Sequence, residues 1–235
     1  THSYSSAASD VYKRQSMQDP IQRHPTRDEQ LDILVSVLAA TLPQGCRVLD
    51  LGCGTGYVDW MLLERRDDLY LTGLDFKPDS LAEAAGALAP WQDKVTLAEA
   101  DFMQAEPLAA ASGQYDAVFT ALVFHDLDDA AKQRTIRAAA DRLNPGGVFL
   151  VYDRVRLTEA ACFPMQQAIW QRIEREHGRG MRDAADFAAY EGDLASNNRP
   201  ATLAGYFAWL PAAGFAAQLL HLHGNVMLMG GVKSS

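Results

Sequence analysis

The feature that most constrains this chain is the stretch from Val48 to Gly56, which reads VLDLGCGTG. An apolar run ends in an acid, three glycines then alternate with small residues, and a helical pattern opens at Tyr57. This order predicts a buried parallel strand, a tight turn and a helix N-terminus. A turn without side chains lets a ligand reach the backbone, and the free N–H groups of a helix start favour a carboxylate or phosphate.

Apolar strand patterns alternate with helical patterns five times along the first two thirds of the chain. The expected strands span 46–51, 70–74, 95–98, 115–122 and 147–152, and the expected helices span 26–42, 57–66, 78–87 and 129–143. This alternation predicts an α/β fold with a doubly wound, mostly parallel sheet, whose ligand lies beyond the carboxyl ends of the strands. Asp50, Asp75 and Asp101 all fall at such ends.

The pattern changes after the fifth strand. Residues 156–199 contain an amphipathic helix over 163–177, and we interpret the whole segment as a helical insertion that covers the site. A helix over 202–210 is interrupted by Pro211, and Gly224-Asn225 joins two extended runs, 215–223 and 226–232. These runs predict a C-terminal antiparallel hairpin at the sheet edge. We expect one domain over 17–235.

The first residues differ in character from the rest. Residues 5–15 resemble the translated read-through of a transposon-type sequencing-library adaptor, which would place the native start near Met17 and the source in environmental DNA. Residues 1–16 are therefore treated as a non-native or flexible leader and excluded from functional reasoning.

Composition excludes several classes of protein. The 235 residues are 48% hydrophobic and 22% charged, which is typical of a soluble globular chain. The net charge of −9 argues against a broad nucleic-acid footprint, and no apolar run is long enough for a membrane span. Three cysteines without metal-ligand spacing favour a reduced, cytoplasmic setting. We expect no metal site, and a monomer or homodimer.

The glycine loop differs from two common cofactor loops. In the nicotinamide and flavin fingerprint G-x-G-x-x-G the third glycine would stand at Tyr57, whereas here it comes one residue early, at Gly56. A phosphate-binding loop would need Gly-Lys-Ser/Thr, which is absent here. The loop therefore fits neither class.

Four motifs together resemble the Rossmann-like class I methyltransferases that use S-adenosyl-L-methionine. They are DLGCGTG at 50–56, the acid Asp75 after the second strand, Asp101-Phe102 after the third, and LNPGG at 143–147. The resemblance covers about residues 30–155, and a weaker similarity extends to residues 213–215 and 231–233. Each motif alone is only moderately specific, but together they occur in order and at the right strand ends.

The resemblance implies a set of cofactor contacts. The loop glycines Gly52, Gly54 and Gly56 would approach the methionyl end of the cofactor, with Asp50 and the Ala121 carbonyl accepting from its ammonium group. Asp75 would accept from both ribose hydroxyls. Around the adenine, Asp101 would accept from the amino group, the Phe102 N–H would donate to the ring and Phe76 would flank it. Each of the three acids could instead cap a turn or helix.

Methyl transfer from a sulfonium is an in-line displacement, so it needs a close and aligned acceptor, and a base only when the acceptor must lose a proton. His125, after the fourth strand, is the candidate base, although it could instead orient a loop through backbone bonds. Asp126 is expected to cap the helix that begins at 129. Tyr152, Arg154 and Arg199 are the candidate acceptor-binding residues, and Arg199 could equally form a surface ion pair.

The leading hypothesis is methyl transfer to a small-molecule acceptor. The first alternative is a tRNA-modification enzyme that uses this cofactor or a carboxylated form of it. Such an enzyme would need a basic groove, or an arginine near the sulfonium for the carboxylated cofactor. The second alternative is a non-catalytic cofactor-binding protein.

Overall fold

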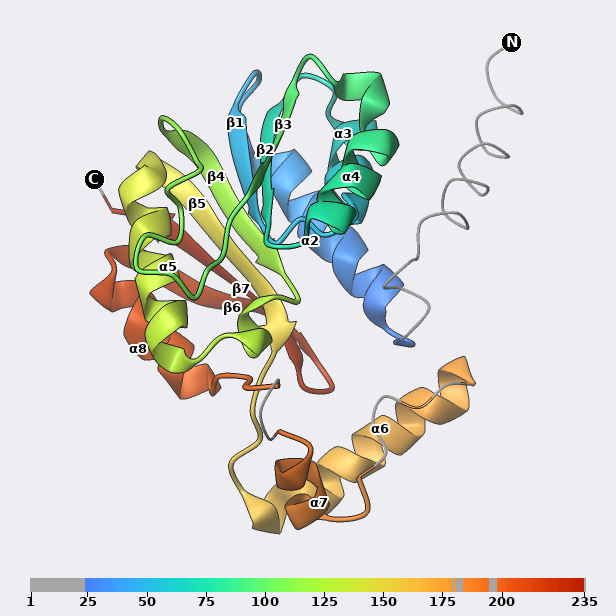
Figure 1. The fold of residues 1–235 in the computed structure, drawn as a ribbon. Helices are drawn as coiled ribbons and strands as arrows, with labels where there is room; N and C mark the ends of the chain where they lie inside the picture. The colour runs from blue at the N-terminus through green and yellow to red at the C-terminus, as the bar shows by residue number, and fades with distance from the viewer. Residues whose placement is uncertain (1–23, 179, 181–183, 195–197, 235) are drawn as a thin grey trace.

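A seven-stranded sheet in the order β3-β2-β1-β4-β5-β7-β6 forms the centre of the fold (Figure 1). The computed structural model describes residues 24–178, 180, 184–194 and 198–234, so the predicted leader over 1–16 lies outside the described residues. The strands are β1 Arg47–Leu51, β2 Tyr70–Asp75, β3 Val95–Glu99, β4 Tyr115–Ala121, β5 Leu143–Arg154, β6 Phe215–His223 and β7 Val226–Lys233. Strands β1 to β5 pair in parallel, whereas β7 is antiparallel to both β5 and β6. The predicted doubly wound sheet with a C-terminal hairpin is confirmed.

Helices cover both faces of the sheet. On one face lie α2 Arg27–Thr41, α3 Tyr57–Arg65 and α4 Pro78–Ala87, and on the other lie α5 Asp129–Arg142 and α8 Leu203–Ala212 (Figure 1). Successive side chains of a strand point to opposite faces of the sheet, and each face has its own apolar core. Val48 packs in the core with α2 and α3, whereas its neighbour Leu49 packs in the core with α5 and α8. None of the helices in the described ranges is long and apolar enough to cross a bilayer.

Several predicted boundaries differ from the observed ones. Helix α5 ends at Arg142 and β5 begins at Leu143, so the Asn144–Gly147 turn lies within the strand as an irregularity in its pairing with β4. Pro211 lies in the last turn of α8 rather than interrupting it, because few backbone bonds remain to be broken so close to a helix end. Thr26 stands at the N-cap of α2, but its hydroxyl donates to Gln30 Oε1 at 3.1 Å.

The described part of the 156–199 insertion forms a small lobe of its own. It contains the short turn η4 Ala160–Cys162, helix α6 Phe163–His177 and helix α7 Phe187–Gly192. A separate apolar cluster, which includes Phe163, Trp170 and Tyr190, holds this insertion lobe together. Figure 1 shows α6 and α7 beyond the end of β5, on the side of the sheet where the parallel strands have their carboxyl ends.

Candidate functional site

The glycine loop after β1 has the backbone geometry that only glycine adopts without strain. Gly52 has φ +89°, and a Cβ there would lie 2.2 Å from Val123 Cγ2 in the segment after β4. Gly56 has φ +76° and stands at the N-cap of α3, so the first N–H groups of that helix have no intrahelical partner. At Gly54 nothing lies within 4 Å of where a Cβ would be, which leaves this part of the backbone open to a ligand.

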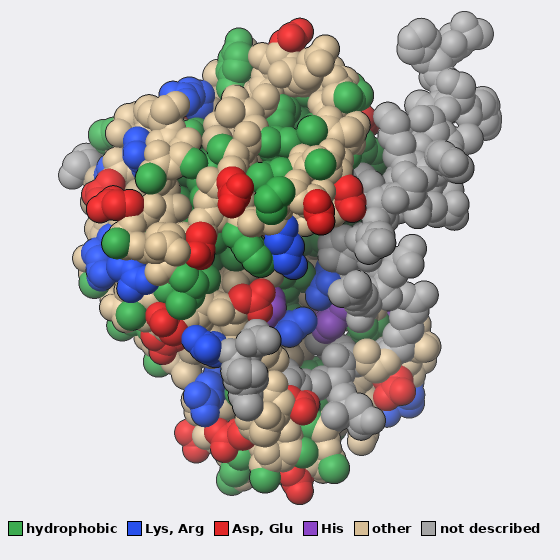
Figure 2. All heavy atoms as spheres, in the orientation of Figure 1, with side chains coloured by type: hydrophobic (Ala, Val, Ile, Leu, Met, Phe, Trp, Pro, Cys, Tyr) green, Lys and Arg blue, Asp and Glu red, His purple; other side chains and the backbone are tan. Residues whose placement is uncertain are grey.

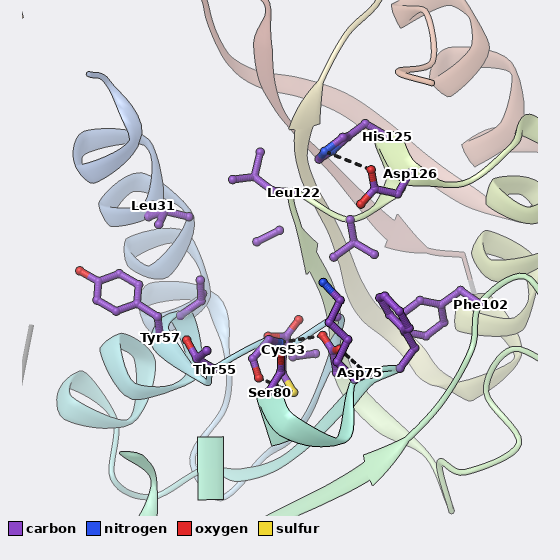
Figure 3. A pocket seen from close by; sticks show the side chains of 18 of the residues that line it. Leu31, Cys53, Thr55, Tyr57, Asp75, Ser80, Phe102, Leu122, His125 and Asp126 are labelled. Carbon is purple, nitrogen blue, oxygen red and sulfur yellow. Dashed lines mark hydrogen bonds and ion pairs between the residues drawn. The ribbon is translucent and has the colours of Figure 1, made fainter. Parts of the chain in front are cut away.

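The loop opens into a cavity of about 320 Å³ (Figure 3). Its walls come from the carboxyl ends of β1, β2, β4 and β5 and from the starts of α2 and α3. The predicted site residues that line it are Asp50, Gly52, Gly54, Asp75, Phe76, Phe102, Ala121, His125 and Arg154. The strand ends therefore meet at one cavity, as the fold class predicts.

Asp75 braces the glycine loop from the end of β2. Its Oδ2 accepts from the Gly54 N–H at 2.9 Å and its Oδ1 accepts from the Lys77 N–H, also at 2.9 Å. The side chain is 8% exposed and faces the cavity (Figure 3). Because each carboxylate oxygen can accept more than one hydrogen bond, Asp75 can hold the loop and still accept from a ligand.

Asp101 behaves differently from the other predicted acids. Its oxygens accept from the Met103 N–H at 2.9 Å and from Gln104 Nε2 at 2.8 Å, and these bonds lower the pKa of its carboxyl group. The residue is exposed and does not line the cavity, whereas its neighbour Phe102 is 4% exposed and does. The structure therefore places Asp101 in a surface turn.

A buried acid that the sequence reasoning missed, Asp59, lies beside Asp50. Asp50 is 2% exposed and Asp59 is fully buried in the first turn of α3. Burial, followed by the charges of Asp59 and Asp75, raises the pKa of Asp50 well above its usual range. Burial raises the pKa of Asp59 to about 7. The sequence signal that could have identified Asp59 was its position in the first turn of the helix, because side chains there point back toward the preceding loop and strand.

His125 is held by a second missed residue, Asp153. His125 is 8% exposed and lies in the short turn η3, Phe124–Asp126. Its Nδ1 lies 2.6 Å from Asp153 Oδ1, and its backbone N–H donates to Asp153 Oδ2 at 2.7 Å. A carboxylate only accepts, so Nδ1 carries the proton and Nε2 is left as the second ring nitrogen, 3.6 Å from Asp126 Oδ1 (Figure 3).

The segment between β4 and His125 is strained. Leu122 has φ +61°, a conformation that costs free energy for any residue except glycine, and its N–H donates to the Tyr152 carbonyl at 2.8 Å. Leu122 lines the cavity next to Ala121 and Val123. Strain of this kind persists where surrounding structure holds the backbone, so this turn is a fixed part of the cavity wall.

The prediction that Asp126 caps α5 is wrong. Asp128 is the N-cap residue, and its Oδ1 accepts from the Ala131 N–H at 2.7 Å. The η3 turn separates Asp126 from the helix and leaves its side chain 62% exposed beside His125.

The three predicted acceptor-binding residues separate in the structure. Arg154 lines the cavity, but Tyr152 is 1% exposed and its hydroxyl donates to Gln30 Oε1 at 3.0 Å. Arg199 lines a different cavity, next to the start of α5, and its backbone N–H donates to the His125 carbonyl at 2.5 Å. Tyr152 lies in the core because β5 continues two residues beyond it.

Positive charge gathers on one part of the cavity wall, near His24. Arg27, which is 7% exposed, and Arg154 both line the cavity there. Burial, and then the charges of Arg27, Arg154 and His223, lower the pKa of nearby His24 to about 4. Figure 2 shows basic and histidine side chains in the hollow between the insertion lobe and the body of the molecule. No described residue of the lobe lines the cavity, and the role of 156–199 as a cover stays a prediction.

Metal binding has no support from the described ranges, which contain no cluster of three His, Cys, Asp or Glu residues that could hold an ion. The groups that line the cavity suit an organic cofactor. They are an open glycine backbone, a helix N-terminus, and carboxylates at the ends of β1 and β2. Asp50 and Asp75 suit a ligand with an ammonium group and hydroxyls. The sheet order and this site are those expected of the class I methyltransferase fold.

Comparison with known proteins supports that assignment. Residues 49–149 match a family model described as a methyltransferase domain. Over this stretch the chain resembles the class I methyltransferases, a family whose methyl donor is S-adenosyl-L-methionine.

The relatives differ in what their names record. An uncharacterized methyltransferase of Synechocystis is 29% identical over 161 residues, which cover 64% of this chain and 70% of that protein. A carboxy-S-adenosyl-L-methionine synthase of Campylobacter curvus is 26% identical, covering 66% and 64%. A ribosomal RNA small subunit methyltransferase C of Erwinia tasmaniensis is 31% identical, covering 59% and 39%. The solved structure of mitomycin 7-O-methyltransferase matches with a TM-score of 0.59 at 19% identity, covering 98% of this chain and 58% of that one.

Proposed function

We propose that this protein transfers a methyl group from S-adenosyl-L-methionine to a hydroxyl group of a small organic molecule, with His125 as the general base. The observation that carries this proposal is the His125–Asp153 pair at the cavity wall, at 2.6 Å. Methyl transfer to a nucleophile that is already unprotonated needs no base, whereas a hydroxyl must lose its proton. The 7-O-methyltransferase among the structural neighbours is consistent with this reaction, although its likeness concerns the fold.

The cofactor would lie along the glycine loop. Asp50 would accept from its ammonium group, Asp75 from its ribose hydroxyls, and the loop N–H groups would meet its carboxylate. The Ala121 carbonyl, at the end of β4, would be a second acceptor for the ammonium group. Phe76 and Phe102, both at the cavity wall, would flank the adenine. Asp101 would join the site only if its carboxylate left the Met103 and Gln104 donors.

The catalytic step depends on how Asp153 holds the imidazole. When bound, the cofactor supplies a methyl group on a sulfonium. Nε2 of His125 accepts the hydroxyl proton of the acceptor, and Asp153 stabilises the imidazolium that forms by accepting from Nδ1. Since both Asp153 oxygens are already engaged by His125, the ring cannot rotate without losing a buried hydrogen bond.

We further propose that the acceptor carries a negative charge, which Arg154 would bind. Arg154 lies on the cavity wall one residue after Asp153, and no carboxylate of the described chain is within ion-pair distance of its guanidinium. Arg27 adds a second positive charge on the same part of the cavity wall. The guanidinium geometry suits a carboxylate or phosphate, which it can bind with two parallel hydrogen bonds.

One observation favours a second candidate function. The same arginines are what a carboxylated form of the cofactor would need, and one relative is a carboxy-S-adenosyl-L-methionine synthase. Under this alternative Arg154 would bind the extra carboxylate on the cofactor, and His125 would have no hydroxyl to deprotonate.

Two measurements separate these candidates. First, mass spectrometry of nucleosides released from the purified protein would reveal which cofactor it retains. S-adenosylmethionine or S-adenosylhomocysteine agrees with methyl transfer, and a carboxylated nucleoside agrees with the alternative. Second, labelled cofactor would be incubated with hydroxylated carboxylic acids, their neutral amides, and bulk tRNA. We expect label on an acid and little on its amide. Label on tRNA alone would contradict the proposal, and an absence of transfer to any acceptor would favour a binding protein without turnover.

A further inference from the structure

Two carboxyl groups lie together under the glycine loop, where most proteins would place at most one. Asp50, near the end of β1, is 2% exposed, and Asp59, in the first turn of α3, is 0% exposed. Asp50 lines the cofactor cavity and Asp59 lies behind it. The function proposed above uses Asp50 of this Asp50–Asp59 pair to bind the cofactor and gives Asp59 no role.

The pair cannot exist as two bare carboxylates at low cost. Both oxygens of Asp59 and Oδ1 of Asp50 are buried with no donor from the described part of the chain. A buried carboxylate without a hydrogen bond is strongly unfavourable, and a second negative charge beside it adds repulsion. One proton shared between the two groups removes both penalties, because it turns their contact into a hydrogen bond and leaves a single negative charge.

The neighbouring groups reinforce this conclusion. Asp75, on β2, adds a further negative charge, and its own carboxylate is already satisfied by the Gly54 and Lys77 N–H groups. Burial raises the pKa of the Cys53 thiol in the loop, so the thiol stays neutral. Among the described residues, the groups whose charges act on the pair are therefore acids, and no cation there compensates them. A ligand with a positive charge would compensate them.

We propose that Asp50 and Asp59 share a proton, so that one is a carboxylic acid that donates a hydrogen bond to the other, and that binding of the cofactor's ammonium group releases this proton to solvent. The ammonium group brings a positive charge to Asp50 and stabilises the doubly ionised pair. Asp59 then acts through Asp50 as a positioning residue that links cofactor affinity to pH. The proposal rests on the cofactor site alone and does not depend on which acceptor is methylated.

The sign of the linkage follows from the charges. Below the pKa of the pair, binding of a cation expels a proton, so cofactor affinity rises with pH, by up to about tenfold per pH unit for one proton. Once the free protein has lost the proton, affinity becomes flat. The rise is therefore expected from about pH 5 through about pH 7, the pKa of Asp59, and the raised pKa of Asp50 extends it.

The test is calorimetric titration of S-adenosylhomocysteine into the full chain, at several pH values and in two buffers of different ionisation enthalpy. The difference in heat between buffers counts the protons released. We expect release by the parent protein below about pH 7, and neither release nor a pH-dependent affinity in Asp59→Asn, whose amide can donate to Asp50 permanently. Asp79→Asn, an exposed acid at the start of α4, is the matched control and should behave as the parent does.

An equal heat in both buffers with the parent protein would overturn the proposal, as would an unchanged pH profile in Asp59→Asn. If Asp59→Asn does not fold, infrared difference spectroscopy of the parent protein gives the second readout. The carbonyl stretch of a protonated carboxylic acid should disappear on cofactor binding at acidic pH, and its absence from the free protein would also overturn the proposal. Failure of methyl transfer in the presence of normal proton release would count only against the proposed function.

Discussion

At the scale of single residues, chemistry in this protein depends on pairs of side chains rather than on isolated ones. His125 gains a defined proton position from Asp153, and Asp50 gains a neighbour in Asp59. In each pair one member lines the cavity and its partner is fully buried and does not. Substitution of the buried partner should therefore change chemistry or proton binding without removing a direct ligand contact.

Substitution of His125 by alanine should lower the rate of methyl transfer by about 10²- to 10⁴-fold, the usual contribution of a general base. Asp153→Asn should lower kcat as well, because the amide can hold the ring with the wrong nitrogen protonated. Cofactor affinity, measured by calorimetry, should stay near that of the parent in both variants. A normal kcat in His125→Ala would show that the histidine only supports the loop.

Asp75→Ala should weaken cofactor binding, because it removes charge-assisted hydrogen bonds worth about 1.5–3 kcal/mol each and releases the Gly54 N–H. Asp101→Ala is the informative comparison, since the structure places Asp101 in a surface turn outside the cavity. Calorimetry should show a large loss of affinity for the first variant and a small one for the second. Equal losses of cofactor affinity in the two variants would support the predicted role of Asp101 in binding the adenine.

Stability should depend on pH through the Asp50–Asp59 pair. The pKa of Asp59 is raised from 3.8 to about 7, so between these values the folded state binds more protons than the unfolded state. Stability therefore falls as pH rises from about 4 through about 7, and the raised pKa of Asp50 adds to this fall. Denaturant unfolding without cofactor should show this fall in the parent protein and a weaker one in Asp59→Asn. A stability that rises across this range in the parent would contradict the ionisation assigned to the pair.

At the scale of elements, the loop after β1 and the segment after β4 are built against each other. A Cβ at Gly52 would lie 2.2 Å from Val123 Cγ2, and Gly52 also needs its φ of +89°. The strained Leu122 stands next to Val123 in the same segment. The two loops thus set the shape of the cavity jointly, although they are about seventy residues apart in the chain.

Gly52→Ala should destabilise the protein by about 1–3 kcal/mol and displace the segment that carries His125, because overpacking and a forced positive φ act together. Combining it with Val123→Ala should recover only the part that comes from the clash. Unfolding midpoints of the two single variants and the double variant give the coupling directly. Strict additivity would show that the two loops do not press on each other.

At the scale of the whole molecule, the insertion lobe has its own small core, and hydrogen bonds at its two ends join it to the rest of the described chain. Among these are the Arg156 N–H to the Ala201 carbonyl at 2.9 Å and the Arg199 N–H to the His125 carbonyl. Its apolar cluster is separate from the two cores of the sheet. The lobe should therefore open more readily than the sheet.

Trp170→Ala should loosen the lobe, since removal of a buried tryptophan costs about 3–5 kcal/mol and here falls on the lobe's own cluster. Hydrogen exchange should quicken in α6 and α7 while amides of β1 and β4 keep their protection. Cofactor affinity should hold, because no described residue of the lobe lines the cofactor cavity. Loss of protection throughout the sheet would mean that lobe and sheet unfold as one unit.

The amino-acid sequence alone determined the order of strands and helices, the glycine loop and the acids that follow β1 and β2. These depend on local features, namely periodicity, capping and the conformational freedom of glycine, which can be read within a few residues. The same local logic was wrong about Asp126 as a cap, and it predicted Tyr152 and Asp101 as site residues although neither lines the cavity. Local patterns did not show this, because strand length and turn bonding decided where those side chains point.

Only the tertiary structure decided which side chains meet. Asp153 reaches His125 because β5 lies next to β4 in the sheet, and Asp59 reaches Asp50 because α3 packs back over β1. Each pair joins residues whose separation along the chain carries no information about distance in space. Strand order and helix packing therefore bring the catalytic and proton-sharing partners together, whereas nine consecutive residues are enough to predict the cofactor loop.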